Sequence, residues 1–298
     1  MPEMRAPKKP MKREKRMNLV GWSMLLPWTI GFLVFTFYPI LTSFRYSLSD
    51  VDLDGAGILV TFVGLANYRA AFSSAAGFAF LQSVLDFALE VLFKVPIITV
   101  FAIIIAVLLN QKIKLRGFFR AIYFLPVIIA SGPVITQLAN QGAATIPLVE
   151  QMGILDFINA TFTPALARPI AGVFDELIVI LWFSGVQILL FIASLQKIDR
   201  SVYEAAMIDG AGPWESFWKI TMPALQSMVR VSVIFTIINL ATFSENPAIQ
   251  HIKNNMFALE TGFGFSSAIA WIYFVALALI LGIVVGLLSA FARKKART

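Results

Sequence analysis

The chain of 298 residues contains no cysteine and a single histidine, His251. Disulfide bonds, thiolate nucleophiles and cysteine-ligated zinc are therefore excluded, and so is a metal site built from several histidines. The dipeptide Gly-Lys does not occur either. A P-loop needs this dipeptide to bind nucleotide phosphates, so the chain contains no P-loop.

Charged residues are also scarce. They make up 14% of the chain, whereas 58% of the residues are hydrophobic and the mean hydropathy is +0.80. Soluble domains contain about 25% charged residues, so this composition cannot supply a water-facing surface, and it is too apolar for intrinsic disorder. The net charge of +7 is typical of a membrane protein that retains Lys and Arg on its cytoplasmic side, and we expect no nucleic-acid partner.

Six apolar stretches approach or exceed the length of about 20 residues that a helix needs to span a bilayer. They are residues 19–44, 88–109, 118–138, 173–195, 228–243 and 267–291. The first is too long for the apolar part of a signal peptide and is followed by no small-residue cleavage site, so we expect an uncleaved helix. The sequence thus predicts an all-α membrane protein with six transmembrane helices.

The positive charges predict the orientation of these helices. Lys and Arg are concentrated in residues 5–16, 112–120, 197–219 and 293–297, and the alternate connections hold few. Short basic connections stay in the cytoplasm, so both termini are expected there. We expect a basic N-terminus, a membrane domain and a tail over residues 1–18, 19–292 and 293–298. The outer connections, which are long enough to carry short interfacial helices and to meet an external partner, are residues 49–87, 140–172 and 244–266.

The connection between the fourth and fifth predicted spans has an unusual pattern. Ser201 and Glu204 fit a capping box that starts a short helix, and Gly210 is a natural stop. Gly212-Pro213 then opens a second short helix, which Pro223 is expected to close. The connection also carries apolar side chains that would be exposed to water, namely Met207, Ile208, Trp214, Phe217 and Trp218.

Such side chains either pack on the ends of their own helices or form an interface with a partner. Contiguous exposed apolar surface usually marks an interface, and a partner's groove receives a helix through apolar residues at helical spacing. The pattern therefore favours docking.

The same connection carries the residues of a known signature. Glu204-Ala205-Ala206, Gly210, Ile220 and Pro223 resemble the EAA signature of the permease subunits of ABC importers, in the carbohydrate-uptake (maltose-type) branch. Further segments also resemble this branch, and together they cover most of the chain. They are Leu26-Pro27-Trp28, Tyr38-Pro39, Gly64-Leu65, Asn67-Tyr68 and Leu195-Gln196.

The resemblance implies a coupling loop over residues 196–227. Glu204 would pair with a basic group of an ATPase subunit, and Gly210 would permit the turn between the two short helices. Ala205, Ala206 and Ala211 would allow close approach, beside Asp209. Ile220 and Pro223 would hold the second helix against the membrane domain.

The resemblance also implies a set of partners. They are a second permease subunit in a heterodimer, two ATPase subunits, an extracytoplasmic solute-binding protein, a carbohydrate and membrane lipid. ATP and magnesium would be bound by the ATPase subunits, so no cofactor or metal is expected in this chain. The location would be a bacterial cytoplasmic membrane. No nucleophile–base pair or metal cluster is visible, so we expect no enzyme.

In this family the solute is expected to pass between the fourth, fifth and sixth spans. Sugar sites combine aromatic stacking with neutral hydrogen-bonding groups. The candidates of these types, with one carboxylate, are Trp182, Ser184, Gln187, Asn239, Phe243, Ser244 and Glu245. Gln187 and Asn239 could equally form interhelical hydrogen bonds, and Trp182 and Phe243 could simply pack.

Few charges lie along this route, which favours a sugar over glycerol 3-phosphate or a polyamine, and we expect an oligosaccharide. Asp86, Glu90 and Lys94 are spaced four apart in the second span. An ion-paired helix face is the favoured interpretation, and an ion relay in a secondary transporter that works alone is the alternative.

Overall fold

A computed structural model describes residues 13–54, 57–111, 177–258 and 261–295, with the single positions 117, 157, 160 and 161. The chain divides into two compact units. The first contains residues 1–74 and 255–271, and the second contains residues 75–254 and 272–298. The predicted third span, residues 118–138, lies outside the described residues.

The first unit begins with a long helical segment that contains one π-helical turn. It comprises α1 (Arg13–Phe32), η1 (Leu33–Phe37) and α2 (Tyr38–Ser47). Pro39 follows the π-turn directly, and the N–H of Tyr38 bonds to the carbonyl of Leu33. A proline removes a donor and crowds the preceding turn, and the wider π-turn lets the helix continue past it. The predicted span 19–44 lies inside this segment.

A β-hairpin follows this helix. Strands β1 (Ser49–Asp54) and β2 (Gly57–Phe62) pair antiparallel, with Ser49 opposite Phe62 and Asp54 opposite Gly57. The described residues are mostly helical, as predicted, but no strand was expected here. The alternation of Asp and apolar residues in β1 is a period-two signal that a search for long apolar runs misses.

The short helix α3 (Ala66–Ala71) holds the hairpin against the start of α15 (Gly262–Lys295). The Asn67 side-chain amide donates to the carbonyls of Ser47 and Ser49, at 3.2 and 2.9 Å. Gly264, in the first turn of α15, lies so close that a Cβ atom there would be 2.2 Å from the Ser49 carbonyl oxygen. The first unit therefore requires a residue without a side chain at this position.

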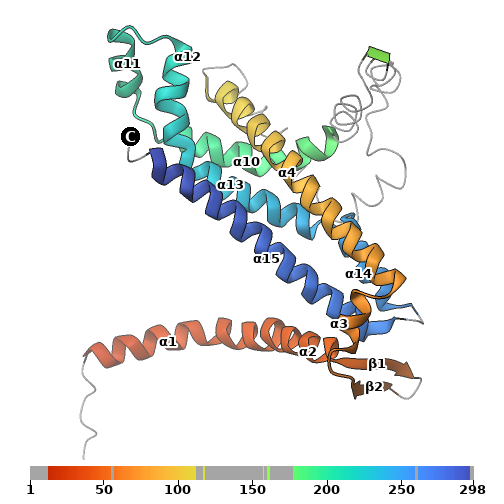
Figure 1. Ribbon diagram of the computed structural model, residues 1–298. Coiled ribbons are helices and arrows are strands. Elements are labelled where there is room, and N and C mark those ends of the chain that lie inside the picture. The colour runs from red at the N-terminus through yellow and green to blue at the C-terminus, as the bar shows by residue number, and fades with distance from the viewer. Residues whose placement is uncertain are drawn as a thin grey trace, which may run out of the picture. The chain divides into compact units, whose positions relative to one another are not determined.

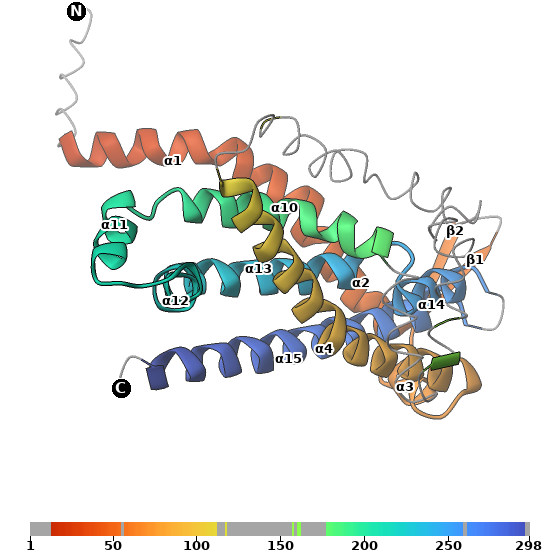
Figure 2. The same ribbon diagram turned by 90° about the horizontal axis from the view of Figure 1, so that it is seen from above.

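The second unit is built on three helices. They are α4 (Ala75–Asn110), α10 (Leu177–Leu195) and α13 (Met222–Thr242). α10 and α13 lie side by side, and α4 crosses both (Figure 1 and Figure 2). Their shared core is aliphatic apart from one phenylalanine, and small residues of α4 permit the close approach. It consists of Ala102, Ile103, Ala106, Leu109, Ile188, Phe191, Ile192, Leu195 and Leu225.

The remaining described helices are α11 (Arg200–Ile208), α12 (Pro213–Ser216), the π-turn η2 (Phe217–Thr221) and α14 (Pro247–Met256). α4 begins at Ala75, inside the predicted outer connection 49–87, because Phe80, Ser83 and Phe87 continue its buried face at helical spacing. The predicted spans 88–109, 228–243 and 267–291 correspond to α4, α13 and α15, and residues 177–195 of the predicted span 173–195 form α10. Residues 173–176 lie outside the described residues.

The sequence predicts that Pro223 closes a second short helix, and this prediction is wrong. The helix runs from Pro213 through η2 into α13, because Pro223 follows a π-turn in which the N–H of Met222 bonds to the carbonyl of Phe217. The same arrangement carries the chain past Pro39.

Four described helical segments are long and apolar enough to cross a membrane: Val20–Ser47, Ala75–Asn110, Pro213–Met256 and Gly262–Ala290. A fifth results if α10 and α11, which meet at a 67° bend, count as one broken span. α4, with 36 residues, is about 54 Å long, well over the roughly 30 Å of a bilayer's hydrocarbon core.

We predict that Gly264→Ala lowers the thermal stability of the chain, because the new methyl group must displace the backbone at Ser49. Overpacking of this kind costs about 1–3 kcal/mol. Gly282→Ala, in the same helix, is the matched control, since a Cβ atom there meets nothing within 4 Å. Thermal unfolding in detergent measures both variants. Equal melting temperatures for both would contradict the close contact.

Candidate functional site

The loop between α10 and α13, residues 196–221, begins with a capped helix. Asp199 is the N-cap of α11, and its carboxylate accepts the backbone N–H of Ser201 at 3.0 Å. The predicted capping box of Ser201 and Glu204 is therefore wrong. Aspartate is as good an N-cap as serine. The backbone of Asp199 is extended, so the first helical residue of α11 is Arg200. Glu204 instead pairs with Arg200 at 3.3 Å.

The cap also fixes the charge of Asp199. The N–H of Ser201 stabilises the carboxylate and holds the pKa of Asp199 below its usual value. A carboxyl group whose pKa is lowered on folding stabilises the fold above its unfolded pKa, and this contribution disappears as the pH falls through its folded pKa. The start of α11 is therefore capped at neutral pH.

The end of α11 is a Schellman motif. Gly210 has a φ of 83°, its N–H bonds to the carbonyl of Met207 at 3.1 Å, and the N–H of Ala211 bonds to the carbonyl of Ala206 at 2.9 Å. These two bonds satisfy carbonyl groups that a helix end leaves free. Gly210 terminates the helix as the sequence predicts, because a left-handed backbone favours glycine.

The loop has two arms: α11 is the first, and α12 with η2 is the second. The second arm is joined to the first. Gly212 is the N-cap of α12 and Pro213 its first residue, as the sequence predicts. The hydroxyls of Tyr203 in α11 and Thr221 in η2 lie 2.8 Å apart and share a hydrogen bond. The rings of Trp214, Phe217 and Trp218 pack on one another, with centroids 5.1–6.3 Å apart. The loop therefore has a defined shape of its own.

Its apolar side chains divide into an inner and an outer group. Phe217 packs against the aliphatic core of α4, α10 and α13. Ile208, Trp214 and Met207 are 87%, 72% and 64% exposed, and Trp218 is 49% exposed. Because the loop is capped and its two arms are joined, these side chains remain exposed on a loop of defined shape and offer apolar surface to a partner. We call Met207, Ile208, Trp214 and Trp218 the apolar loop surface.

The other signature residues surround this surface. Ala205, Asp209 and Gly210 are exposed, and Ala206 and Ala211 are half-buried at the Schellman turn. The Glu204 side chain is 57% exposed and its partner Arg200 74%, so the pair is available to another protein. The last two signature residues, Ile220 and Pro223, are half-buried where η2 enters α13.

The predicted pathway residues fall into different environments. Ser184 and Gln187 are completely buried between the helices of this chain. The Ser184 hydroxyl donates to the carbonyl of Leu181 in its own helix at 2.8 Å. The Gln187 amide donates to the Thr236 hydroxyl of α13 at 2.8 Å. Gln187 thus forms the interhelical hydrogen bond that the sequence left as an alternative.

The other candidates lie nearer a surface. Asn239 donates to the carbonyl of Phe235 in its own helix at 3.1 Å, and Phe243 packs edge-on against Phe183, with ring centroids 5.3 Å apart. Ser244 and Glu245 follow α13 and are half-buried. Trp182 is half-buried too, but its indole N–H is itself buried and has no partner among the described residues.

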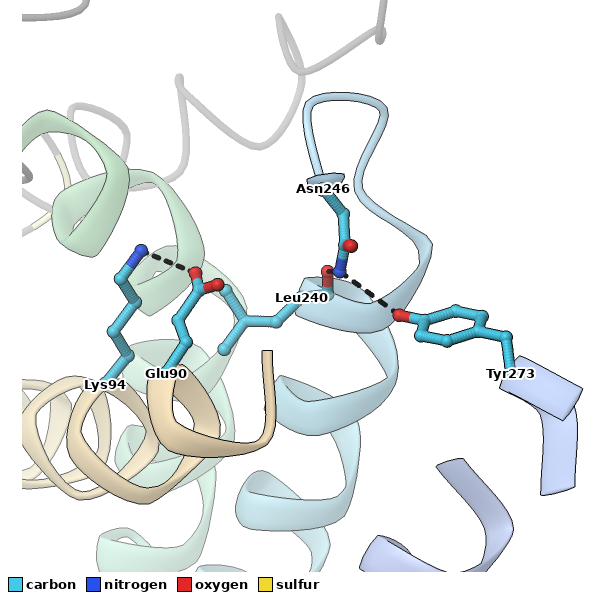
Figure 3. Close-up of polar contacts among 5 residues, drawn as sticks. All are labelled: Glu90, Lys94, Leu240, Asn246 and Tyr273. Carbon is cyan, nitrogen blue, oxygen red and sulfur yellow. Dashed lines mark hydrogen bonds and ion pairs between the residues drawn. The ribbon is translucent and has the colours of Figure 1, made fainter. Parts of the chain in front are cut away.

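A polar network that the sequence analysis did not predict ties α13 to α15. The Asn246 amide donates to the carbonyl of Leu240 and to the Tyr273 hydroxyl, both at 3.1 Å (Figure 3). Tyr273 in turn donates to the carbonyl of Ala241 at 2.8 Å. Asn246 also caps α14 by accepting the N–H of Ala248 at 2.9 Å. Asn followed by Pro at a helix start was the available signal.

The charged residues of α4 form local pairs. Lys94 is bonded to Glu90 as the i,i+4 spacing predicts (Figure 3). Asp86 accepts the side-chain amide of Gln82 at 3.0 Å. Within the part of the chain that the structure describes, no group of three or more His, Asp or Glu side chains could hold a metal ion.

A cavity of about 430 Å³ lies between α4, α13 and α15. Its lining is aliphatic except for Thr99, whose hydroxyl donates to the carbonyl of Val95 at 2.7 Å. None of the predicted pathway residues lines it. A sugar site needs hydrogen-bonding groups, so this cavity is not a candidate.

No family model matches the chain. It is 30% identical over 237 residues to the lactose transport system permease protein LacF of Rhizobium radiobacter. This match covers 76% of this chain and 74% of LacF. It is also 30% identical to the trehalose/maltose transport system permease protein MalF of Thermococcus litoralis, over 76% of this chain and 75% of MalF. The chain belongs to the family of sugar ABC transporter permeases.

Two further comparisons agree with this membership. The multiple sugar-binding transport system permease protein MsmF of Streptococcus mutans is 28% identical over 90% of this chain and 92% of its own. The crystal structure of a bacterial ABC transporter that imports the acidic polysaccharide alginate superposes with a TM-score of 0.61 at 18% identity, over 95% of this chain and 98% of that one. The chain therefore has the fold of an ABC permease and is an integral membrane protein.

We predict that Gly210→Ala loosens the end of α11, because a side chain at a φ of 83° costs about 1–2 kcal/mol. Gly212→Ala is the control, since Gly212 has a φ of −71° and open space around it. Hydrogen exchange of the Ala211 amide measures the effect, and it should accelerate in Gly210→Ala alone. Equal exchange in both variants would contradict the Schellman motif.

Proposed function

We propose that this permease forms part of the translocation pathway of an ATP-driven sugar importer and that its α10–α13 loop docks on an ATPase subunit. The observation that carries this proposal is the apolar loop surface. Side chains as large as Ile208 and Trp214 remain exposed on a loop whose own ends are capped and joined. Burying them against a partner removes apolar area from water and stabilises the complex.

Each signature residue then has a physical role. The carboxylate of Glu204 offers a charged acceptor beside the apolar surface, and Arg200 holds it in place. The small side chains of Ala205, Ala206 and Ala211 let the partner's backbone come close. Closure of the ATPase subunits on ATP would pull the loop, and the loop would move α10 and α13 to give alternating access.

The chain supplies no ATP site of its own, since it contains no P-loop. ATP and magnesium are bound by two separate ATPase subunits, and the permease itself is not an enzyme. A second permease completes the pathway as a heterodimer. A solute-binding protein delivers the solute from outside, and the related alginate transporter has been crystallised with an alginate pentasaccharide-bound periplasmic protein.

The orientation follows from the basic residues. The α10–α13 loop carries Lys197, Arg200 and Lys219, and both ends of the chain are basic. Short basic segments stay on the cytoplasmic side, so the loop and both termini face the cytoplasm of a bacterial cell. The ATPase subunits lie on that same side.

The solute is an oligosaccharide. Relatives of this chain are named for the transport of lactose, trehalose and maltose, multiple sugars and arabinooligosaccharides. The half-buried candidates Trp182, Asn239, Phe243 and Ser244 supply aromatic faces and neutral hydrogen-bonding groups, which sugars require. Glu245 is the carboxylate among the candidates.

Ile208→Glu tests the docking surface. Because Ile208 is 87% exposed, the substitution leaves the fold intact but places a charge in the apolar interface. Loss of an interface residue worth about 1.4 kcal/mol or more weakens binding at least tenfold. We therefore expect the ATPase subunits to be lost on co-purification and ATP-dependent uptake to fall at least tenfold.

Phe257→Glu is the matched control. Phe257 is a similarly exposed apolar residue, at 77%, in the connection between α14 and α15. Co-purification with the ATPase subunits should be unchanged in this variant. Normal co-purification and uptake with Ile208→Glu would overturn the docking proposal.

ATP hydrolysis by the assembled complex tests the solute. The solute-binding protein is offered oligosaccharides, glycerol 3-phosphate and a polyamine in turn, and stimulation of hydrolysis is recorded. We expect stimulation by an oligosaccharide alone. Stimulation by glycerol 3-phosphate or the polyamine would refute a sugar solute, and uptake by the lone permease without ATPase subunits would refute an ATP-driven importer.

A further inference from the structure

Among the described residues, a buried polar atom of α10 and another of α13 have no hydrogen-bond partner. They are the side-chain oxygen Oε1 of Gln187 and the hydroxyl of Ser232. Both side chains are completely buried. Buried polar groups without a partner are rare in folded proteins, because each loses its hydrogen bonds to water and gains nothing in return. Two of them in one helix contact require an explanation.

The two groups lie at neighbouring levels of the same contact. Gln187 Nε2 donates to the hydroxyl of Thr236 at 2.8 Å, and that hydroxyl donates in turn to the carbonyl of Ser232 at 2.8 Å. Ser232 precedes Thr236 by four residues, so the two hydroxyls share one face of α13, a helical turn apart. The Gln187 amide thus faces a column of two hydroxyls and is bonded to one.

A second arrangement would satisfy both orphaned atoms. α10 runs into the loop and α13 runs out of it, so Ser232 lies nearer the loop than Thr236 does. A shift of α10 along α13 toward the loop, by up to about one turn or 5.4 Å, brings the Gln187 amide opposite Ser232. There Oε1 accepts the serine hydroxyl, and Nε2 gives up its bond to Thr236. Sliding by one turn between packed helices is a known form of protein switching.

The surrounding core permits such a shift. Apart from the Gln187 contact, α10 and α13 meet α4 mainly through aliphatic side chains such as Ile188 and Leu225 and through Ala102 and Ala106. Apolar contacts have no preferred direction, so a shift breaks no directional bond in this core, and the side chains have only to interdigitate again. Hydrogen bonds are directional, so the polar column sets which positions are stable.

We propose that Gln187 and Ser232 are positioning residues for transport. Gln187 bonds to Thr236 in the conformation described above, and to Ser232 in the other conformation of the transport cycle. The pair thereby holds α10 at one of two defined positions against α13, the two helices that carry the ends of the loop. This inference rests on the proposed function, because it assigns the two positions to the transport cycle.

Ser232→Ala separates this role from a structural one. The Ser232 hydroxyl is bonded to none of the described residues, so its removal breaks no hydrogen bond among them. If it is used only in the second conformation, sugar uptake per ATP hydrolysed should fall about fivefold, which is the effect of one net hydrogen bond. Assembly with the partner subunits and the KM for the sugar should not change.

Ser83→Ala is the matched control. Ser83 is also buried, in α4, and its hydroxyl bonds to its own helix, at the carbonyl of Ala79. This variant should couple uptake to hydrolysis as the unaltered permease does. Normal coupling in Ser232→Ala, or an equal loss in both variants, would overturn the proposal.

Disulfide cross-linking gives a second test, which the absence of cysteine makes clean. Gln187→Cys is combined either with Thr236→Cys or with Ser232→Cys in the assembled complex in membranes. Without nucleotide the 187–236 pair should cross-link faster, and with ATP and orthovanadate the 187–232 pair should do so. An unchanged order of the two rates would refute the shift.

The two tests also separate this inference from the proposed function. A complex that hydrolyses ATP but imports no sugar would refute the proposed solute, whereas the order of the cross-linking rates would still decide whether α10 shifts along α13.

Discussion

The contact between α10 and α13 determines most of what this permease can do. These helices carry the two ends of the α10–α13 loop, and α4 crosses both of them (Figure 2). Leu195 at the end of α10 and Leu225 at the start of α13 belong to one aliphatic core, against which Phe217 of the loop also packs. The loop is therefore fixed to the membrane helices by buried side chains, and a force on the loop acts directly on those helices.

The loop itself gains its shape from short-range interactions. Asp199 caps the start of α11, Gly210 ends it in a Schellman motif, and the Tyr203–Thr221 hydrogen bond joins the two arms. These interactions satisfy the backbone without using the apolar loop surface. That surface is therefore free to bind a partner, and the partner does not have to order a flexible segment first, which would weaken binding.

Local features of the site could be predicted from the sequence. The stop at Gly210 and the start at Pro213 follow from backbone conformations that few residues can adopt, so no tertiary information is needed. The N-cap could not be chosen, because Asp199 and Ser201 are equally good caps and the 67° bend after α10 decides between them. Pro223 was misread because a preceding π-turn lets a helix continue past a proline.

Features that depend on how the helices pack could not be predicted from the sequence as well. The amide of Gln187 is a group that sugar sites commonly use. The direction of this side chain depends on how α10 packs against α13, however, and in the structure it is bonded to Thr236. The network of Asn246 and Tyr273 joins residues that are far apart in the sequence. The hairpin of β1 and β2 has no long apolar run, and its period-two alternation covers only a few residues, so it is a weak signal in a sequence dominated by apolar spans.

Docking of an ATPase subunit on the apolar loop surface is the central claim, and thiol labelling measures it directly. In a chain without cysteine, Ile208→Cys and Phe257→Cys each introduce a single exposed thiol. The rate of maleimide labelling at position 208 should fall strongly when the ATPase subunits are bound, and the rate at position 257 should not change. If the rate at position 208 were the same in the lone permease and in the assembled transporter, the surface would not be the docking site.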